Sequence, residues 1–88
     1  MGIGANYFLL WENNMDMKET FGERLKTLRL EKGLGQIELA KALDVGKSII
    51  SLWERDKCEP TLTNLIAIAQ FFNVSIDYLA GLISMDGG

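Results

Sequence analysis

Residues 36–60 read QIELAKALDVGKSIISLWERDKCEP and leave little freedom in how the chain folds. Apolar side chains recur at helical spacing on both sides of the short segment 44–46, Asp-Val-Gly, which interrupts the pattern. Two short amphipathic helices joined by a tight turn are therefore predicted over 36–43 and 47–55. Their apolar faces carry Leu39, Ala40 and Leu43 before the turn and Ile50 and Trp53 after it.

An earlier helix is predicted from Thr20 to about Lys32. The sequence Thr-Phe-Gly-Glu places a hydroxyl at the helix start and Glu23 three residues later, which is the pattern of a capping box. Gly33 then supplies the left-handed residue that ends a helix. The buried stripe of this helix is expected to consist of Phe21, Leu25 and Leu28.

Two further helices are predicted after Pro60, which marks a break in the chain. Thr61 can cap a helix over 62–72, and Ser75 can cap a short one that runs to about Leu82. The apolar face expected on the longer helix comprises Leu62, Leu65, Ile66, Ala69 and Phe72, and that on the shorter one comprises Ile76 and Leu79.

The predicted fold is all-α, a compact five-helix bundle that occupies residues 17–84. Residues 1–16 differ in character, because glycine and asparagine surround one apolar cluster, Tyr7–Trp11. We expect residues 1–16 to form a flexible N-terminal extension. The alternative is that Tyr7–Trp11 docks on the domain or on a second subunit, since so much exposed apolar surface is otherwise a liability.

Composition and length exclude several classes of protein. The 88 residues suffice for one domain, and no apolar run approaches the roughly 18 residues of a membrane span. With no histidine and one cysteine, neither a multi-ligand metal site nor an internal disulfide framework is available, and a cytoplasmic setting is favoured. The sequence offers no nucleophile–base pair, phosphate loop or catalytic carboxylate pair, so we expect neither an enzyme nor a cofactor.

The net charge of −3 opposes a nucleic-acid role, because nucleic-acid-binding domains are usually strongly basic. The acidity, however, lies at the two ends of the chain. Residues 1–19 and 61–88 each sum to −2, whereas residues 20–60 carry eight basic and seven acidic side chains. The middle of the chain can therefore present a locally basic face.

These patterns together resemble the lambdoid-repressor and Cro type of helix-turn-helix protein, the XRE family. The resemblance runs from about Phe21 to Leu82 and so covers the predicted bundle. It implies a lambda-repressor-like DNA-binding domain whose helix over 47–55 enters the major groove. Its motifs are Gln36-x-x-Leu39-Ala40, the Val45 turn, Ile50-x-x-Trp53-Glu54, Lys57, Pro60 and the closing V-S-I-D-Y-L at 74–79.

The resemblance also implies which side chains meet DNA bases. Lys47, Ser48 and Leu52 fall where relatives commonly face bases, and Ser51 and Ile49 border that surface. Lys47 is the strongest candidate for a directional contact, to O6 or N7 of guanine. The apolar Ile49 and Leu52 can read a thymine methyl group, or they can pack against the preceding helix or another subunit instead.

By the same resemblance, four residues contact phosphates. Gln36 lies where the start of its helix meets a phosphate, and the backbone N–H groups of Gly35 and Gln36 can assist. Arg55 and Lys57 lie at and just after the end of the helix over 47–55, the reading helix that enters the groove. They resemble residues that contact the opposite wall of the groove.

Arg29 and Glu54 match a family ion pair that ties the reading helix to the rest of the domain. The alternative for these two residues is a pair of independent solvated charges. The chain departs from the family pattern at Gly35 and Gly46, which replace hydroxyl or amide helix caps, and at Asp44, where relatives often have glycine.

The leading hypothesis is a sequence-specific DNA-binding transcriptional regulator, a repressor that binds a two-fold symmetric operator in double-stranded DNA as a homodimer. The subunit contact is expected at the last helix with Phe72–Tyr78, or at Tyr7–Trp11. The alternative is a protein-interaction module or antitoxin with the same fold that acts mainly on a protein partner. The acidic ends, the N-terminal extension, Ile49 and Leu52 favour that alternative.

Overall fold

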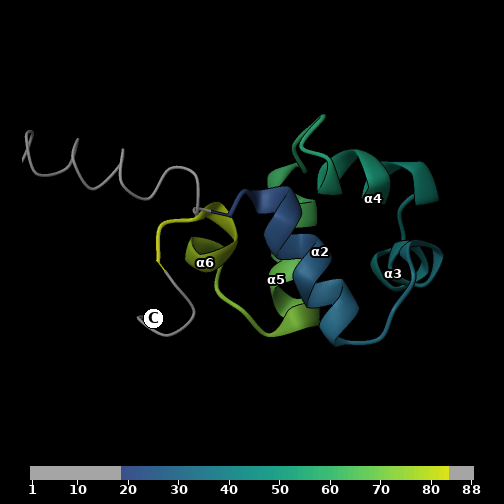
Figure 1. The fold of residues 1–88 in the computed structure, drawn as a ribbon, viewed down its shortest axis with the longest axis horizontal. Helices are drawn as coiled ribbons and strands as arrows, with labels where there is room; N and C mark the ends of the chain where they lie inside the picture. Colours follow the sequence, from purple (N-terminus) through teal and green to yellow (C-terminus); the bar gives the residue numbers. More distant parts are fainter. Residues whose placement is uncertain (1–18, 84–88) are drawn as a thin grey trace, which may run out of the picture.

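The computed structural model describes residues 19–83, and within that range it contains five helices and no strand (Figure 1). The prediction of an all-α fold with five helices is confirmed. None of these helices is long and apolar enough to cross a bilayer. The predicted extension over 1–16, including Tyr7–Trp11, lies outside the described residues. The helices are α2 (Phe21–Glu31), α3 (Gln36–Leu43), α4 (Lys47–Glu54), α5 (Leu62–Phe72) and α6 (Ile76–Ala80).

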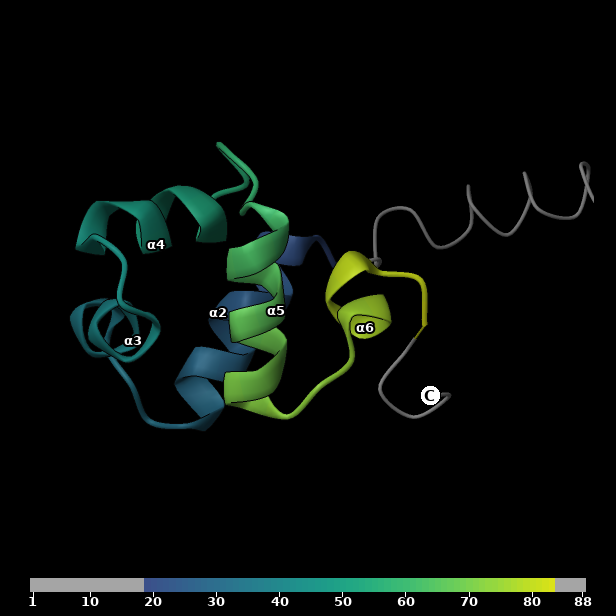
Figure 2. The same cartoon turned by 180° about the vertical axis from the view of Figure 1, so that it is seen from behind.

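The helices surround one apolar core. Helix α2 contacts α4 and α6, α5 contacts α3 and α6, and α3 contacts α4. Helices α3 and α4 therefore lie together at one end of the domain and α6 at the other, with α2 and α5 between them (Figures 1 and 2). Each helix contributes two buried apolar side chains, which are Leu25 and Leu28, Leu39 and Ala40, Ile50 and Trp53, Ile68 and Ala69, and Tyr78 and Leu79.

Three helices begin at the predicted capping residues. The hydroxyls of Thr20, Thr61 and Ser75 each accept a hydrogen bond from the backbone N–H three residues later, at 3.1, 3.2 and 2.9 Å respectively. Helices α3 and α4 begin instead at Gly35 and Gly46, which have no side chain to accept such a bond. The two helices proposed to meet DNA are thus the two that start without a side-chain cap.

All five helices end in the same way, with one residue in the left-handed conformation. The residue after it donates its N–H to the carbonyl five residues earlier, which satisfies an otherwise unpaired group at the helix end. The predicted stop at Gly33 is confirmed, and Asp44 does adopt the left-handed conformation. The left-handed residues are Gly33, Asp44, Asp56, Asn73 and Gly81.

Two expectations for the last two helices were wrong. Leu62 and Ile66 were placed on the buried face of α5 but are exposed, whereas Ile68 is fully buried. Apolar residues lie nearly all round α5, so its periodicity does not determine which side faces the core, and packing against α3 and α6 does. Helix α6 ends at Ala80 rather than near Leu82, because Gly81 turns into the left-handed conformation.

Helices α2 and α4 approach each other closely at Gly22. A β-carbon added at Gly22 would lie 2.5 Å from the carbonyl oxygens of both Trp53 and Glu54. These are backbone atoms at the end of α4, and they cannot move aside as a flexible side chain can. The missing side chain of Gly22 is therefore what lets the first turn of α2 lie against the end of α4.

Gly22→Ala should lower the free energy of unfolding by about 1–3 kcal/mol, because the added methyl group forces the two helices apart. Urea denaturation measures the change. Gly46→Ala is the matched control, since Gly46 has open space around it and a φ of −71° that any residue adopts. Because Gly46 is the N-cap of α4, where alanine is less favourable than glycine, we expect Gly46→Ala to cost less than about 1 kcal/mol. Equal stability of the two variants would contradict the close approach.

Candidate nucleic-acid interface

Helix α4 presents a polar edge at its start. Lys47 and Ser48 are exposed, and Ser51 and Leu52 are half-buried. Ile49 is also half-buried, and it packs against the apolar core. Of the five residues predicted to face or border bases, Lys47 and Ser48 are thus the most accessible, and part of the apolar surface of Ile49 is already covered.

A shallow hollow on the surface joins the starts of α3 and α4. It is lined by Gly35, Gln36, Ile37, Glu38 and Lys47. Gln36 was predicted to contact a phosphate and Lys47 a base, and the fold brings the two residues to one concave surface. The N-terminal ends of α3 and α4 therefore open on the same side of the domain.

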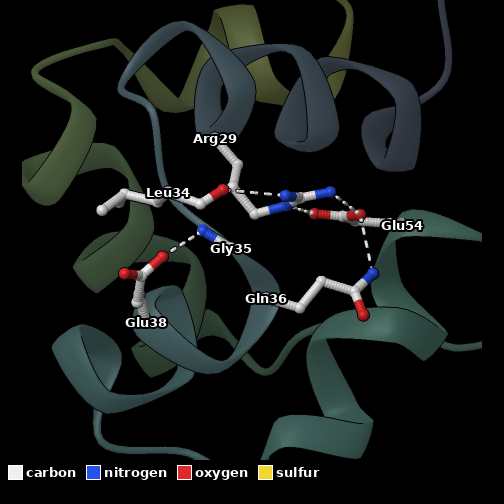
Figure 3. Close-up of polar contacts among 6 residues, drawn as sticks. All are labelled: Arg29, Leu34, Gly35, Gln36, Glu38 and Glu54. Atoms are coloured by element: carbon white, nitrogen blue, oxygen red, sulfur yellow. Dashed lines mark hydrogen bonds and ion pairs between the residues drawn. The ribbon is translucent and has the colours of Figure 1, made fainter.

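A buried ion pair between Arg29 and Glu54 holds the far end of α4. Arg29 Nε lies 2.6 Å from Glu54 Oε2, and Arg29 Nη2 lies 3.0 Å from Glu54 Oε1, so the contact is bidentate (Figure 3). Both side chains are more than nine-tenths buried. The hydrogen bonds to Glu54 raise the pKa of Arg29 although burial opposes the rise, which keeps the guanidinium charged. The expected pair is present, and it joins α2 to α4.

Two further hydrogen bonds extend this pair to α3. Arg29 Nη1 donates to the carbonyl oxygen of Leu34 at 2.9 Å, and Gln36 Nε2 donates to Glu54 Oε1 at 3.1 Å (Figure 3). Leu34 belongs to the linker between α2 and α3, and Gln36 is the first residue of α3. One polar network therefore fixes α2, the start of α3 and the end of α4 relative to one another.

The start of α3 already carries an acidic partner. The N–H of Gly35 donates a hydrogen bond to the carboxylate of Glu38 (Figure 3). A phosphate that approached Gly35 would compete with this carboxylate. Gln36 still has one side-chain N–H beyond the one that contacts Glu54, because an amide nitrogen carries two.

Basic side chains follow the end of α4. Arg55 and Lys57 are both exposed. Arg55 Nε donates to Ser51 Oγ at 3.2 Å, which draws the guanidinium back along α4 toward the predicted base-facing residues. Lys47 is the first residue of α4, so cations stand at the start of the helix and just beyond its end.

Asp56, which was not singled out from the sequence, joins the loop after α4 to the start of α2. Thr20 Oγ1 donates to Asp56 Oδ2 at 2.6 Å, and the N–H of Gly22 donates to Asp56 Oδ1 at 2.9 Å. These partners lie 36 and 34 residues earlier in the chain. No local pattern indicates so distant a contact, which depends on α2 and α4 packing together.

A helix-turn-helix family model matches residues 25–79. That span is more than half of the chain, and the chain belongs to the helix-turn-helix family. The crystal structure of the c2 repressor of Salmonella phage P22 in complex with a synthetic operator matches the fold with a TM-score of 0.70. The two chains are 34% identical, and the match covers 74% of this chain and 98% of the other.

Two further relatives come from Bacillus subtilis. The structure of SinR, the master regulator of biofilm formation, in complex with DNA has a TM-score of 0.63 and 34% identity, covering 68% of this chain and 97% of that one. The transcriptional regulator ImmR is 39% identical over 62 residues, which are 70% of this chain and 49% of ImmR. This chain thus spans about half the length of ImmR.

Glu54→Gln should lower the free energy of unfolding by about 3–5 kcal/mol, because it leaves the buried Arg29 charge without its counterion. A thermal or urea melt measures the loss. Glu59→Gln removes an exposed carboxylate in the next loop and should change stability by less than about 0.5 kcal/mol. Replacing both partners, Arg29→Met with Glu54→Leu, should recover part of the loss. The role of the pair is rejected if Glu54→Gln and Glu59→Gln melt alike.

Proposed function

We propose that this protein is a sequence-specific DNA-binding transcriptional regulator, a repressor that binds a two-fold symmetric operator as a homodimer with α4 in the major groove. The proposal rests chiefly on α4, whose exposed edge has cations at both ends and whose position is fixed by the buried Arg29–Glu54 pair. The c2 repressor and SinR, which share the fold, were solved with DNA bound, which supports the same role for this chain. Such a regulator acts in the cytoplasm, where the DNA is.

The dimensions of α4 suit the groove. An α-helix with its side chains is about 10–12 Å across, and the major groove is about 12 Å wide. Lys47 stands at one end of the helix, and Arg55 and Lys57 stand beyond the other. A helix laid in the groove brings these cations to phosphates on its two walls.

Base selection falls to the residues at the start and middle of α4. Lys47 Nζ carries three N–H donors, so it donates both to O6 or N7 of guanine and to a neighbouring phosphate. Ser48 and Ser51 supply hydroxyl groups that donate or accept. Leu52 is half-buried and offers its remaining surface to a thymine methyl group. Ile49 contributes least, because it packs against the core.

A second set of phosphate contacts lies at the start of α3. The free side-chain N–H of Gln36 binds a phosphate, while the other holds Glu54 and so keeps the amide in place. The N–H of Gly35 contacts a phosphate only when it is released from its hydrogen bond to the Glu38 carboxylate. Gln36 is therefore the principal phosphate residue of α3.

Binding as a dimer follows from the small footprint of one α4. Two half-sites about 34–36 Å apart, one helical turn, double the contacts and set the symmetry of the operator. In the segment Phe72–Tyr78, Tyr78 is buried in its own subunit. The half-buried Phe72, Val74 and Ile76 are the apolar side chains that this segment offers to a second subunit.

An interaction module or antitoxin acting mainly on a protein partner is the second candidate. Apolar side chains exposed on the domain favour it, namely Ile37 at 52% and Leu62 at 66% exposure. The two candidates differ in whether the isolated protein selects a DNA sequence.

Selection from a random pool of duplexes at two salt concentrations should enrich a two-fold symmetric motif, with half-sites about one helical turn apart. Enrichment should be sharper at the higher salt concentration, because salt weakens the sequence-independent phosphate contacts. An unenriched pool would favour the interaction module.

Placed across a promoter, the selected motif should lower reporter expression when the protein is present, and raised expression would contradict repression.

Affinity for the selected duplex should fall steeply with salt. If Lys47, Arg55 and Lys57 of both subunits neutralise about six phosphates, log K against log salt has a slope of about −5. Lys57→Gln removes one contact per subunit and should bring the slope to about −3.5. Lys32→Gln is the control and should leave the slope unchanged. Lys32 follows the C-terminal end of α2, away from the residues proposed to contact DNA, and its Nζ lies 5.4 Å from the Phe71 ring centroid. A wild-type slope near zero rejects phosphate binding.

A further inference from the structure

The loop that carries Arg55 and Lys57 is anchored to α2 through the residue between them. Asp56 accepts hydrogen bonds from the hydroxyl of Thr20, the N-cap of α2, and from the N–H of Gly22 in its first turn. We infer that Asp56 is a positioning residue, which sets the two basic residues against the phosphates on one wall of the groove. This inference rests on the proposed function.

The backbone at Asp56 is constrained from a second direction. Asp56 has a φ of 57°, its N–H donates to the Trp53 carbonyl at 3.0 Å, and the next N–H, that of Lys57, donates to the Leu52 carbonyl at 2.9 Å. These bonds fix the direction in which the chain leaves α4. The side chains of Arg55 and Lys57 are exposed, so the anchored backbone rather than burial decides where their charges are held.

The carboxylate of Asp56 would be unfavourable on a phosphate-binding face if it acted only as a charge, because it stands beside two cations and would repel DNA. Its oxygens instead face the N-terminal end of α2, where the helix dipole and the Gly22 N–H, which has no partner within the helix, favour a negative group. If Asp56 positions the loop, removing its side chain lowers the affinity for DNA; if it only repels phosphates, removing it raises the affinity. The two roles can be separated by a pair of variants.

Asp56→Asn and Asp56→Gly both remove the charge, and both residues tolerate a positive φ. Asparagine keeps the anchor: its oxygen accepts the Gly22 N–H, and its NH₂ group donates to Thr20 Oγ1, whose hydroxyl hydrogen turns away. Glycine keeps only the backbone conformation. The difference between these two variants is therefore the anchor itself.

On the selected duplex, we expect Asp56→Asn to bind at least as tightly as wild type, with a salt slope of about −5. Asp56→Gly should bind roughly 10- to 30-fold more weakly at about 0.15 M salt, with a slope of about −3.5, as one phosphate contact per subunit is lost. A residue that merely stabilised the fold would leave the slope unchanged. Circular dichroism melts of both variants confirm that binding is compared on folded protein.

Amide hydrogen exchange measures the hydrogen bond between the Gly22 N–H and residue 56 without DNA. The Gly22 N–H should exchange slowly in wild type and in Asp56→Asn, and quickly in Asp56→Gly. Equal affinity and slope for the two variants, while wild type binds DNA, would overturn the inference and leave the proposed function standing. A wild-type slope near zero would instead reject the proposed function, and the role of Asp56 with it.

Discussion

The buried ion pair between Arg29 and Glu54 is the contact on which the arrangement of the proposed DNA-binding elements depends. Two charges removed from water are stable only when they are paired in good geometry and held by further hydrogen bonds. Arg29 meets this requirement with both Glu54 oxygens and the Leu34 carbonyl, and Glu54 also accepts from Gln36. Satisfying one pair therefore places α2, the linker, α3 and α4 together. A small displacement of α4 along α2 would break several of these bonds at once.

This scaffold allows the groups proposed to meet DNA to remain exposed. Lys47, Ser48, Arg55 and Lys57 gain little from burial, so their usefulness depends on where the backbone holds them. The start of α4 is held by the turn from α3, and its end is held by Glu54. The following loop is held by Asp56. The contacts of Glu54 and of Asp56 with α2 both require glycine at position 22, because any larger residue would push α2 away from the end of α4.

Much of this fold could be predicted from the sequence. Thr20, Thr61 and Ser75 cap the helices expected of them, and the stop at Gly33 falls where it was predicted. The buried face of α5 could not be predicted in this way, because apolar side chains nearly encircle the helix and Leu62 looks as suitable for the core as Ile68. Of the proposed site, the Arg29–Glu54 pair followed from a family resemblance. The contacts of Gly35 with Glu38 and of Asp56 with α2 did not.

The sequence by itself determined the helices, their caps and their order, because hydrogen bonds over three to five residues and apolar periodicity are local and are written in neighbouring side chains. Only the tertiary structure decided which face of α5 is buried, how closely α2 meets α4, and what Asp56 binds. Those outcomes depend on atoms from segments far apart in the chain, such as Gly22 and Asp56. Such atoms meet only after the helices have packed, so no local pattern contains them.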